Sequence, residues 1–365
     1  MPSRRVAGDV AVVPFTPDGL PSELAALAPA EVLDRWRSAD RSARSPEIVA
    51  VLDGDAWSGA ALVTARAGAA YRKIVDAAGD VPAVVAAVER LARERGLVQL
   101  KWEGWTVSPA DAAALGFTPL RTPLESAVGT GEPAAGHVRW LAEAAVSEPP
   151  YYRQTEDFTC GAVVALMAQA GAGAVAEEAV DRAAELALWR SATNFPACEP
   201  VGLGVAVRRM WPDATVEVAL DVDRPVMVGH LPEPERRWRA VLQRSSRADA
   251  AAIGLAVDGR RIGVDEVRAA IGRGERALLL VSLARMQGFD VPHWVLCHGT
   301  AGGAVVIEDP WTGAATGDTW VDAHLLPIGD ASLDEMSALE EDGYRGVVRI
   351  GPPDGLGRGA FTAAS

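Results

Sequence analysis

The fold of this chain is decided by a short stretch, QTEDFTCG (Gln154–Gly161), which leads directly into a helix-forming run, Ala162–Ala170. A cysteine in the first turn of a helix lies where unpaired backbone N–H groups and the positive end of the helix dipole stabilise a thiolate. Thr159 is a suitable N-cap, and the run has apolar residues on one face. We therefore predict that Cys160 begins a helix that packs into a core.

A lone cysteine before a helix is more often a buried, inert thiol than a nucleophile. What favours the nucleophile is a second stretch, PHWVLCH (Pro292–His298), followed by GTAGG and then AVVIEDP (Ala304–Pro310). Two β-rich runs around a glycine-rich loop predict an antiparallel hairpin. If His298 pairs with Ala304, His293 stands directly opposite Asp309, and opposed residues share a face.

A histidine beside a carboxylate has its tautomer fixed, which leaves the other ring nitrogen to take a proton from a nucleophile. Cys160, His293 and Asp309 are therefore the candidate catalytic triad. Gln154 adds a side-chain amide that can donate to an oxyanion beside the thiol. Glu308 is expected to point to the opposite face, which makes Asp309 the better orienting carboxylate.

These residues resemble a known family. Gln-x5-Cys-Gly, then His-aromatic-Val and an Asp-Pro sixteen residues after the histidine, is similar to the papain-fold cysteine peptidases that cut double-glycine leaders from bacteriocin precursors. The chain looks most like their soluble bacterial relatives, in which the peptidase-like domain follows a GNAT-type domain. The resemblance covers roughly residues 148–350 and implies a papain-like α+β fold and a role in peptide maturation.

Two further segments are similar to segments of those relatives: Leu188–Thr193 and Cys198–Leu203. The region between Trp189 and Gly204 is expected to wall the cleft, so we predict that Glu199 and Trp189 bind substrate. Glu199 is the one obvious cradle there for an ammonium group. Trp294, next to His293, is the third predicted substrate-binding residue. The relatives tend to have a longer glycine-rich loop before the Cys198 position, so this part of the cleft is expected to differ.

The N-terminal third predicts a strand, two helices, three strands, an amphipathic helix (Val81–Arg95), a strand, a short helix and a last strand. That order, and the run ALGFTPL (Ala114–Leu120), resemble a GNAT acetyltransferase. Such domains bind the CoA pyrophosphate on backbone amides of a glycine-rich loop at a helix N-terminus. The corresponding run here, DAAGDVP (Asp76–Pro82), carries two aspartates, which predicts a degenerate domain used for structure or recognition.

Composition excludes several function classes. The 365 residues carry 49 acidic and 35 basic side chains, a net charge of −14, which argues against nucleic acid or an anionic membrane as partner. No apolar run reaches the ~18 residues that span a bilayer. Three cysteines and no signal peptide indicate a reducing cytoplasm. Cys198 and Cys297 are expected to be structural thiols.

No metal site or cofactor is expected. His293, Cys297 and His298 form a compact group, but strand alternation turns His298 away from the other two, which leaves a metal ion short of ligands.

The sequence thus predicts a GNAT-like α/β domain over 1–128, a linker helix over 129–147, a papain-like cysteine peptidase domain over 148–351 and a disordered tail over 352–365. The predicted activity is thiol-dependent hydrolysis of a peptide or isopeptide bond in a peptidyl substrate. Two alternatives remain: acyl transfer or transpeptidation through the same thioester, and a leader-binding module without turnover. The substrate and the oligomeric state are left open.

Overall fold

A computed structural model describes residues 4–6, 10–129, 132–192, 196–229 and 231–353. The chain divides into two compact units. The first contains Met1–Thr122, Gly131–Ala144 and Thr312–Pro327, and the second contains Pro123–Thr130, Ala145–Trp311 and Ile328–Ser365. The region expected to form the peptidase domain thus contains a segment, Thr312–Pro327, that packs with the first unit. Of the tail expected over 352–365, residues 354–365 lie outside the described part.

The first unit is built on a sheet with the strand order β1-β2-β3-β4-β5-β6-β8-β7, in which only β5 and β6 run parallel. Its strands are β1 (Arg4–Val6), β2 (Val10–Pro14), β3 (Glu47–Asp53), β4 (Ala56–Thr64), β5 (Tyr71–Gly79), β6 (Gln99–Glu103), β7 (Thr118–Pro119) and β8 (Gly136–Trp140). Its helices are α1 (Leu24–Leu27), α2 (Ala30–Arg37), η1 (Ser42–Arg44), α3 (Val81–Glu94), α4 (Pro109–Ala114), η3 (Ala314–Thr316) and α11 (Trp320–Ala323).

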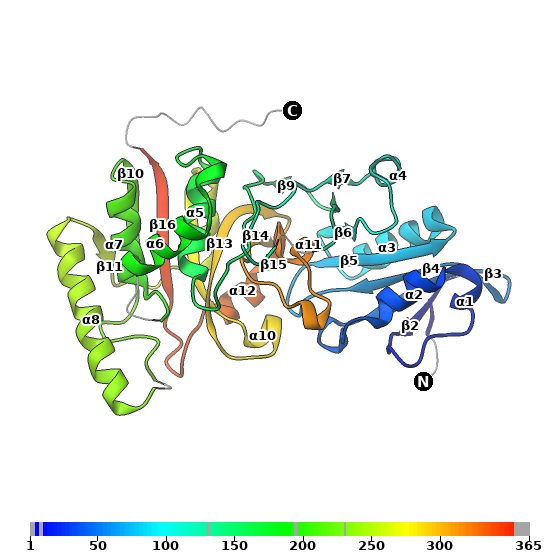
Figure 1. The fold of residues 1–365 in the computed structure, drawn as a ribbon, viewed down its shortest axis with the longest axis horizontal. Coiled ribbons are helices and arrows are strands. Elements are labelled where there is room, and N and C mark those ends of the chain that lie inside the picture. The colour runs from blue at the N-terminus through cyan, green and yellow to red at the C-terminus, as the bar shows by residue number, and fades with distance from the viewer. Residues whose placement is uncertain (1–3, 7–9, 130–131, 193–195, 230, 354–365) are drawn as a thin grey trace. The chain divides into compact units, whose positions relative to one another are not determined.

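The amphipathic helix of the first unit is confirmed. Helix α3 buries Val84, Val85, Val88 and Leu91, and it joins β5 to β6 as the crossover that a parallel strand pair requires. The strand and helix order predicted for the N-terminal third is therefore present (Figure 1).

The predicted linker helix is wrong. Residues Gly136–Trp140 form strand β8, which pairs with β6 from Gln99↔Trp140 to Glu103↔Gly136. The spacing of His137, Trp140 and Leu141 fits a helix, but the open edge of β6 offers unpaired backbone groups that a strand satisfies. Tertiary pairing has overridden the local pattern here.

The second unit is built on a sheet with the order β11-β10-β16-β12-β13-β14-β15, with β9 pairing to β13. Its strands are β9 (Ala144–Ala145), β10 (Ala214–Leu220), β11 (Ala256–Asp258), β12 (Arg276–Ser282), β13 (Pro292–Ala301), β14 (Ala304–Glu308), β15 (Leu326–Gly329) and β16 (Gly346–Pro353); β9 and β15 cross the division between the units. Its helices are α5 (Cys160–Gly171), η2 (Glu177–Ala179), α6 (Arg182–Ala192), α7 (Pro200–Met210), α8 (Glu233–Ala252), α9 (Val264–Gly272), α10 (Ala284–Gln287) and α12 (Asp330–Met336).

Helix α5 is the centre of the second unit. Every residue from Cys160 to Ala170 is buried, because the helix packs against β13, β12, α6 and α7 rather than against one neighbour (Figure 1). The sequence predicts one apolar face, whereas the helix is apolar all round, as expected for a helix inside a core. Such a helix holds its first residue on a rigid support.

The segment Thr312–Pro327 is bound to the first unit by buried charged groups. The Arg66 guanidinium donates to both carboxylate oxygens of Asp318, at 3.0 and 2.6 Å. Lys73 bonds Asp322, and Lys101 donates to the carbonyl oxygens of Asp322 and His324. Burial alone would raise the pKa of Asp322, but Lys73 and Arg66 lower it. The two lysines are the only ones in the sequence, and both are buried.

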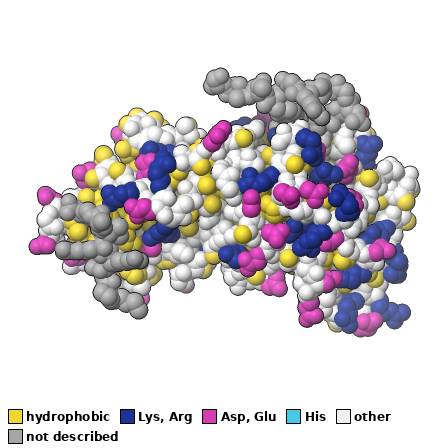
Figure 2. All heavy atoms as spheres, turned by 180° about the vertical axis from the view of Figure 1, so that it is seen from behind, with side chains coloured by type: hydrophobic (Ala, Val, Ile, Leu, Met, Phe, Trp, Pro, Cys, Tyr) yellow, Lys and Arg dark blue, Asp and Glu magenta, His cyan; other side chains and the backbone are white. Residues whose placement is uncertain are grey.

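On the face seen in Figure 2, basic and acidic side chains are interspersed rather than gathered by sign. Within the described part of the chain, no helix is both long enough and apolar enough to cross a bilayer. The same residues include no group of three or more His, Cys, Asp or Glu side chains arranged to hold a metal ion.

Candidate active site

Cys160 is the first residue of α5, as predicted, and 4% of it is exposed. Thr159 occupies the N-cap position, but its side chain makes no capping hydrogen bond. Its backbone, at φ −95° and ψ 5°, also departs from the extended conformation usual for an N-cap. The predicted side-chain cap is therefore wrong, although the helix begins where expected.

The β13–β14 hairpin has a different register from the one predicted. Ala301 pairs with Ala304 around a tight Gly302–Gly303 turn, so His298 does not pair with Ala304. A bulge at His298 then shifts the pairing by one residue, and Leu296 faces Glu308. Continued by one residue, this register places Asp309 opposite Val295 and diagonal to His293.

The bulge explains why the pair still meets. Compared with the predicted pairing of His298 with Ala304, the tight turn alone displaces the register by three residues. An odd displacement would put Asp309 on the opposite face of the sheet from His293. The extra residue of the bulge reduces the displacement to two, which restores the shared face. Diagonal neighbours on one face lie within reach of a long side chain such as histidine.

His293 and Asp309 form a buried hydrogen bond, with His293 Nε2 2.7 Å from Asp309 Oδ1. Their exposed fractions are 3% and 0%. The backbone N–H of Trp311 also donates to Asp309 Oδ1, at 2.9 Å, and the Tyr151 hydroxyl donates to the Asp309 carbonyl oxygen at 2.9 Å. The Trp311 bond thus fixes the carboxylate and the Tyr151 bond fixes the backbone of Asp309, and Nδ1 of His293 remains as the ring nitrogen that can serve a thiol.

The pKa of His293 reflects three groups. Burial would lower it, because desolvation disfavours the imidazolium. The Asp309 carboxylate and the Cys160 side chain oppose this by charge and by hydrogen bonding, and they raise the pKa of His293 to about 10. The structure therefore brings Cys160, His293 and Asp309 together.

Gln154 lies in the loop that leads to α5 and is almost fully buried. Its backbone N–H donates to the Pro310 carbonyl oxygen at 3.0 Å, which ties this loop to the segment that follows Asp309. Its Nε2 donates to the Glu156 carbonyl oxygen at 2.8 Å, and an amide nitrogen carries a second hydrogen. An oxyanion-binding role for Gln154 remains a prediction.

Two of the three predicted substrate-binding residues, Glu199 and Trp294, are buried and make structural hydrogen bonds. Glu199 caps α7: its two carboxylate oxygens accept from Val201 N at 2.8 Å and Gly202 N at 2.6 Å, and 2% of it is exposed. Trp294 is 1% exposed, and its indole N–H donates to the Cys198 carbonyl oxygen at 3.0 Å. Glu199 is thus buried as a helix cap, and its predicted role as an ammonium-binding group remains a prediction.

Trp189 remains partly exposed at the end of α6. Its ring packs against Phe158, with centroids 4.9 Å apart, and its N–H donates to the Pro196 carbonyl oxygen. A substrate-binding role for Trp189 remains a prediction.

The other two cysteines lie in poor environments for a nucleophile. Burial raises the pKa of Cys297 to about 12, and burial together with the charges of Cys160 and Glu199 raises the pKa of Cys198 well above its ordinary value. Both are essentially inaccessible. Their expected role as structural thiols fits these surroundings.

His298 and Glu308 form a second buried pair on the hairpin. His298 Nδ1 donates to the Ser147 carbonyl oxygen at 3.1 Å, and Nε2 lies 2.9 Å from Glu308 Oε1 in a geometry that is not a hydrogen bond. Glu308 thus lies against His298, whereas Asp309 bonds His293.

Glu185 was missed by the sequence reasoning. This fully buried carboxylate accepts hydrogen bonds from the loop that precedes Cys160, namely from Tyr152, Thr155 and Thr159. A signal was present: Glu185, Leu188 and Ala192 occupy the buried stripe of α6, so a charged residue stands at a core position. Such a residue needs partners, and here the nucleophile loop supplies them.

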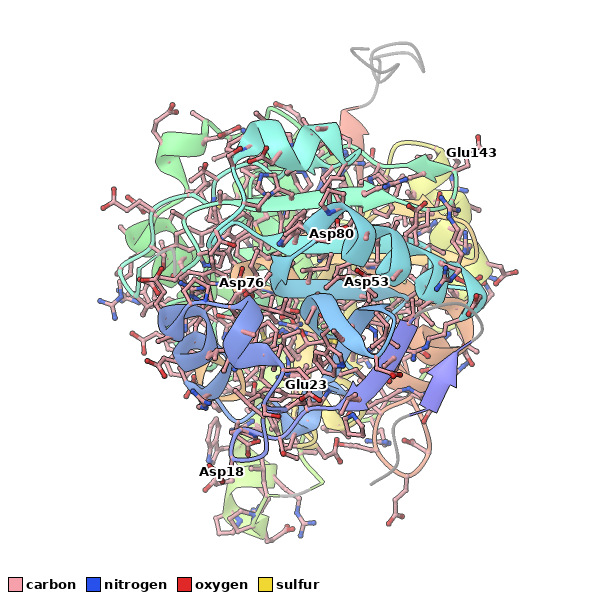
Figure 3. All side chains as sticks on the ribbon, turned by 90° about the vertical axis from the view of Figure 1, so that its right-hand side faces the viewer. Asp18, Glu23, Asp53, Asp76, Asp80 and Glu143 are labelled. Atoms are coloured by element: carbon pink, nitrogen blue, oxygen red, sulfur yellow. The ribbon has the colours of Figure 1, made fainter. Side chains whose placement is uncertain are left out.

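The acidic run Asp76–Asp80 covers the end of β5 and the N-cap of α3. Asp80 caps α3 through a hydrogen bond from Ala83 N at 3.1 Å, so the helix N-terminus is occupied by the chain's own carboxylate. Asp76 is buried and bonds Arg35 and Thr106. Figure 3 looks onto the side of the first unit on which Asp76, Asp80 and Asp53 are labelled. Of the two aspartates in the run, Asp80 is the exposed one, and its charge at the helix N-terminus would repel a pyrophosphate.

Solved structures similar to this chain fall into two groups. One described as a C39-like peptidase, from Bacillus anthracis, aligns over 57% of this chain and 97% of its own, at 11% identity and a TM-score of 0.30. A Bacillus subtilis acetyltransferase solved with CoA aligns over 36% and 97%, at 12% identity and a TM-score of 0.26. A tandem GNAT protein from the clavulanic acid biosynthesis pathway aligns over 94% and 98%, at 12% and 0.24. Scores this low support no inference about chemistry.

No curated protein matches the chain. Residues 149–351, more than half of the sequence, match the Peptidase_C39 like family. The chain is an α+β protein with two sheets, and it belongs to the Peptidase_C39 like family.

Proposed function

We propose that this protein is a cysteine peptidase-like hydrolase that cleaves a peptide or isopeptide bond through Cys160, His293 and Asp309. The observation that carries the proposal is the buried His293–Asp309 hydrogen bond, together with the contribution of Cys160 to the raised pKa of His293. A histidine that bonds a carboxylate on one side and a thiol on the other has the arrangement required for nucleophilic catalysis.

In the proposed reaction, the Cys160 thiolate attacks an amide carbonyl carbon and forms a C–S bond. The carbonyl electron pair moves onto oxygen, and Gln154 Nε2 and the backbone N–H of Cys160 stabilise this oxyanion. The C–N bond then breaks as the His293 imidazolium gives its proton to the leaving amine. Neutral His293 next takes a proton from water, which hydrolyses the thioester and regenerates the thiolate.

Acyl transfer to an amine is the alternative, since His293 can activate an amine as readily as water. A transferase must hold that amine in the cleft. Glu199, the one candidate for that role in the predicted cleft wall, is buried and caps α7, which supports the preference for hydrolysis. Hydrolysis is the reaction that the described residues favour.

A peptide-library digestion in water labelled with heavy oxygen tests the proposal. We expect new carboxylates that carry the label, and their loss in the Cys160→Ala variant but not in Cys297→Ala. Products that are unlabelled amides, formed when an amine mixture is added, would replace hydrolysis by transfer. Turnover that persists in Cys160→Ala would refute the assigned nucleophile, and binding of peptides without turnover would indicate the leader-binding module.

A further inference from the structure

The carboxylate of Glu185 connects the loop before the nucleophile to helix α6. Oε1 accepts from the Thr155 backbone N–H at 2.8 Å and from the Thr159 hydroxyl, and Oε2 accepts from the Thr155 hydroxyl at 2.9 Å and the Tyr152 hydroxyl at 3.2 Å. Each oxygen thus has two donors. A buried carboxylate with this many bonds fixes the groups that bond to it.

The bond to Thr159 has a specific effect on Cys160. The angle ψ of Thr159 sets the plane of the Thr159–Cys160 peptide, and hence the direction of the Cys160 N–H. A threonine at an N-cap usually has an extended backbone and accepts a hydrogen bond from the helix. Here the hydroxyl donates to Glu185 instead, and ψ is 5°. Relaxation to the usual cap would rotate that peptide plane by more than a right angle.

We propose that Glu185 is a positioning residue that aims the Cys160 backbone N–H at the oxyanion, by holding Thr159 out of the capping conformation. The inference rests on the proposed thiol hydrolase and assigns Glu185 no contact with substrate. It predicts that breaking the Glu185–Thr159 bond impairs reactions that build an oxyanion, while leaving the thiolate itself reactive.

Two reagents separate these effects without knowledge of the substrate. With p-nitrophenyl acetate, the thiolate attacks the ester carbonyl, an oxyanion forms, and p-nitrophenolate leaves with the C–O electron pair. With iodoacetamide, the thiolate displaces iodide at a saturated carbon, and no oxyanion forms. The ratio of the two rates therefore measures oxyanion stabilisation, whereas a general loss of structure lowers both rates.

Thr159→Val keeps the branched shape of the side chain and removes the bond to Glu185. We expect acylation by p-nitrophenyl acetate to fall about 10²-fold, the effect of losing one oxyanion donor, and alkylation by iodoacetamide to change less than about threefold. Thr159→Ser, which keeps the hydroxyl, should restore acylation. Thr300→Val, the same change on β13 at the far end of the hairpin from His293, is the control and should leave both rates unchanged.

Glu185→Gln gives a second, independent variant. Its remaining oxygen can keep the bonds to Thr155 N and Thr159, but a neutral acceptor competes less well with the Glu156 carbonyl oxygen, 2.9 Å from the Thr159 hydroxyl. Acylation should fall by less than in Thr159→Val, again with alkylation retained. This variant decides the question if Thr159→Val does not fold, as judged by circular dichroism.

The inference is overturned if both variants acylate at the wild-type rate, or if acylation and alkylation fall in step. The proposed function fails in a different way: the wild-type protein would then be alkylated at Cys160 yet not acylated by the ester at all.

Discussion

Replacing Asp309 separates two things that this carboxylate does for His293. Its charge helps raise the pKa of His293 from the ordinary 6.5 to about 10, which is worth about 5 kcal/mol between the protonated and neutral rings. Its Oδ1 also fixes the ring through Nε2. Asp309→Asn removes the charge, whereas Asp309→Ala removes both the charge and the acceptor.

The structure predicts different rates for the two variants. The Trp311 N–H donates to the same oxygen that bonds His293, so an asparagine is held with its oxygen, not its nitrogen, toward the ring. The tautomer is then preserved, and we expect Asp309→Asn to lower kcat/KM by about 10–10²-fold, less than the ~10⁴ of a serine-protease triad in which that exchange leaves the wrong tautomer. Asp309→Ala should lower kcat/KM by about 10³–10⁴-fold.

The pH profile should change equally in both variants, because both lose the charge. For the wild-type protein the alkaline limb of kcat/KM with p-nitrophenyl acetate should lie near pH 10, and removing one close opposite charge should lower it by about 1–3 pH units. Asp290→Asn, an exposed carboxylate that bonds Ser282, is the control. Equal rates for Asn and Ala, or an alkaline limb that stays near pH 10 in both, would refute the reasoning.

The same pKa has a consequence for stability. A folded-state pKa raised above its unfolded value stabilises the fold below the unfolded pKa, and this stabilisation is lost as the pH rises through the folded value. Urea unfolding should therefore show Asp309→Asn less stable than wild type at pH 7, with a gap that narrows toward and above pH 10. A gap that widens with pH would contradict the assignment.

Three further outcomes are expected. Iodoacetamide should label Cys160 before Cys198 and Cys297, because burial raises the pKa of the latter two, and mass spectrometry that finds either of them labelled first contradicts the site. Acetyl-CoA should show no binding tighter than about millimolar by calorimetry, because the acidic loop before α3 offers no amide nest; micromolar binding would restore the acetyltransferase. Glu199→Ala should destabilise the fold by about 0.5–2 kcal/mol through the lost cap, without altering the ratio of hydrolysis to transfer.

The helix at Cys160 and the order of elements in the N-terminal third could be predicted because their signals are local. Apolar periodicity defines α3 and α5, and Cys160 stands where the run begins. The family resemblance rests on four positions in fixed order, which needs no knowledge of packing.

The hairpin register could not be predicted, since it depends on whether Gly299 or Gly302 forms the turn and on a bulge at His298. The predicted register differs from the observed one in the position of the turn and in the bulge at His298. The two differences add up to an even shift, so Asp309 still lies on the same face as His293. The capping role of Glu199 could not be predicted either. A carboxylate before Pro200 can cap a helix or line a cleft, and only its hydrogen-bond partners distinguish the two. Strand β8 formed because β6 had an open edge, which no local pattern reveals.

The burial of Lys73 and Lys101 allows the unfolding of the first unit to be detected by amine modification. Both lysines of the sequence belong to the first unit, and all three cysteines belong to the second. An amine-directed reagent such as an N-hydroxysuccinimide ester can therefore modify a lysine side chain only where the first unit has opened. Maleimide labelling of the buried Cys198 and Cys297 reports on the second unit in the same way, whereas Cys160 is expected to react in the folded protein. Footprinting with the two reagents during heating would follow the melting of each unit in an unlabelled, unmutated protein.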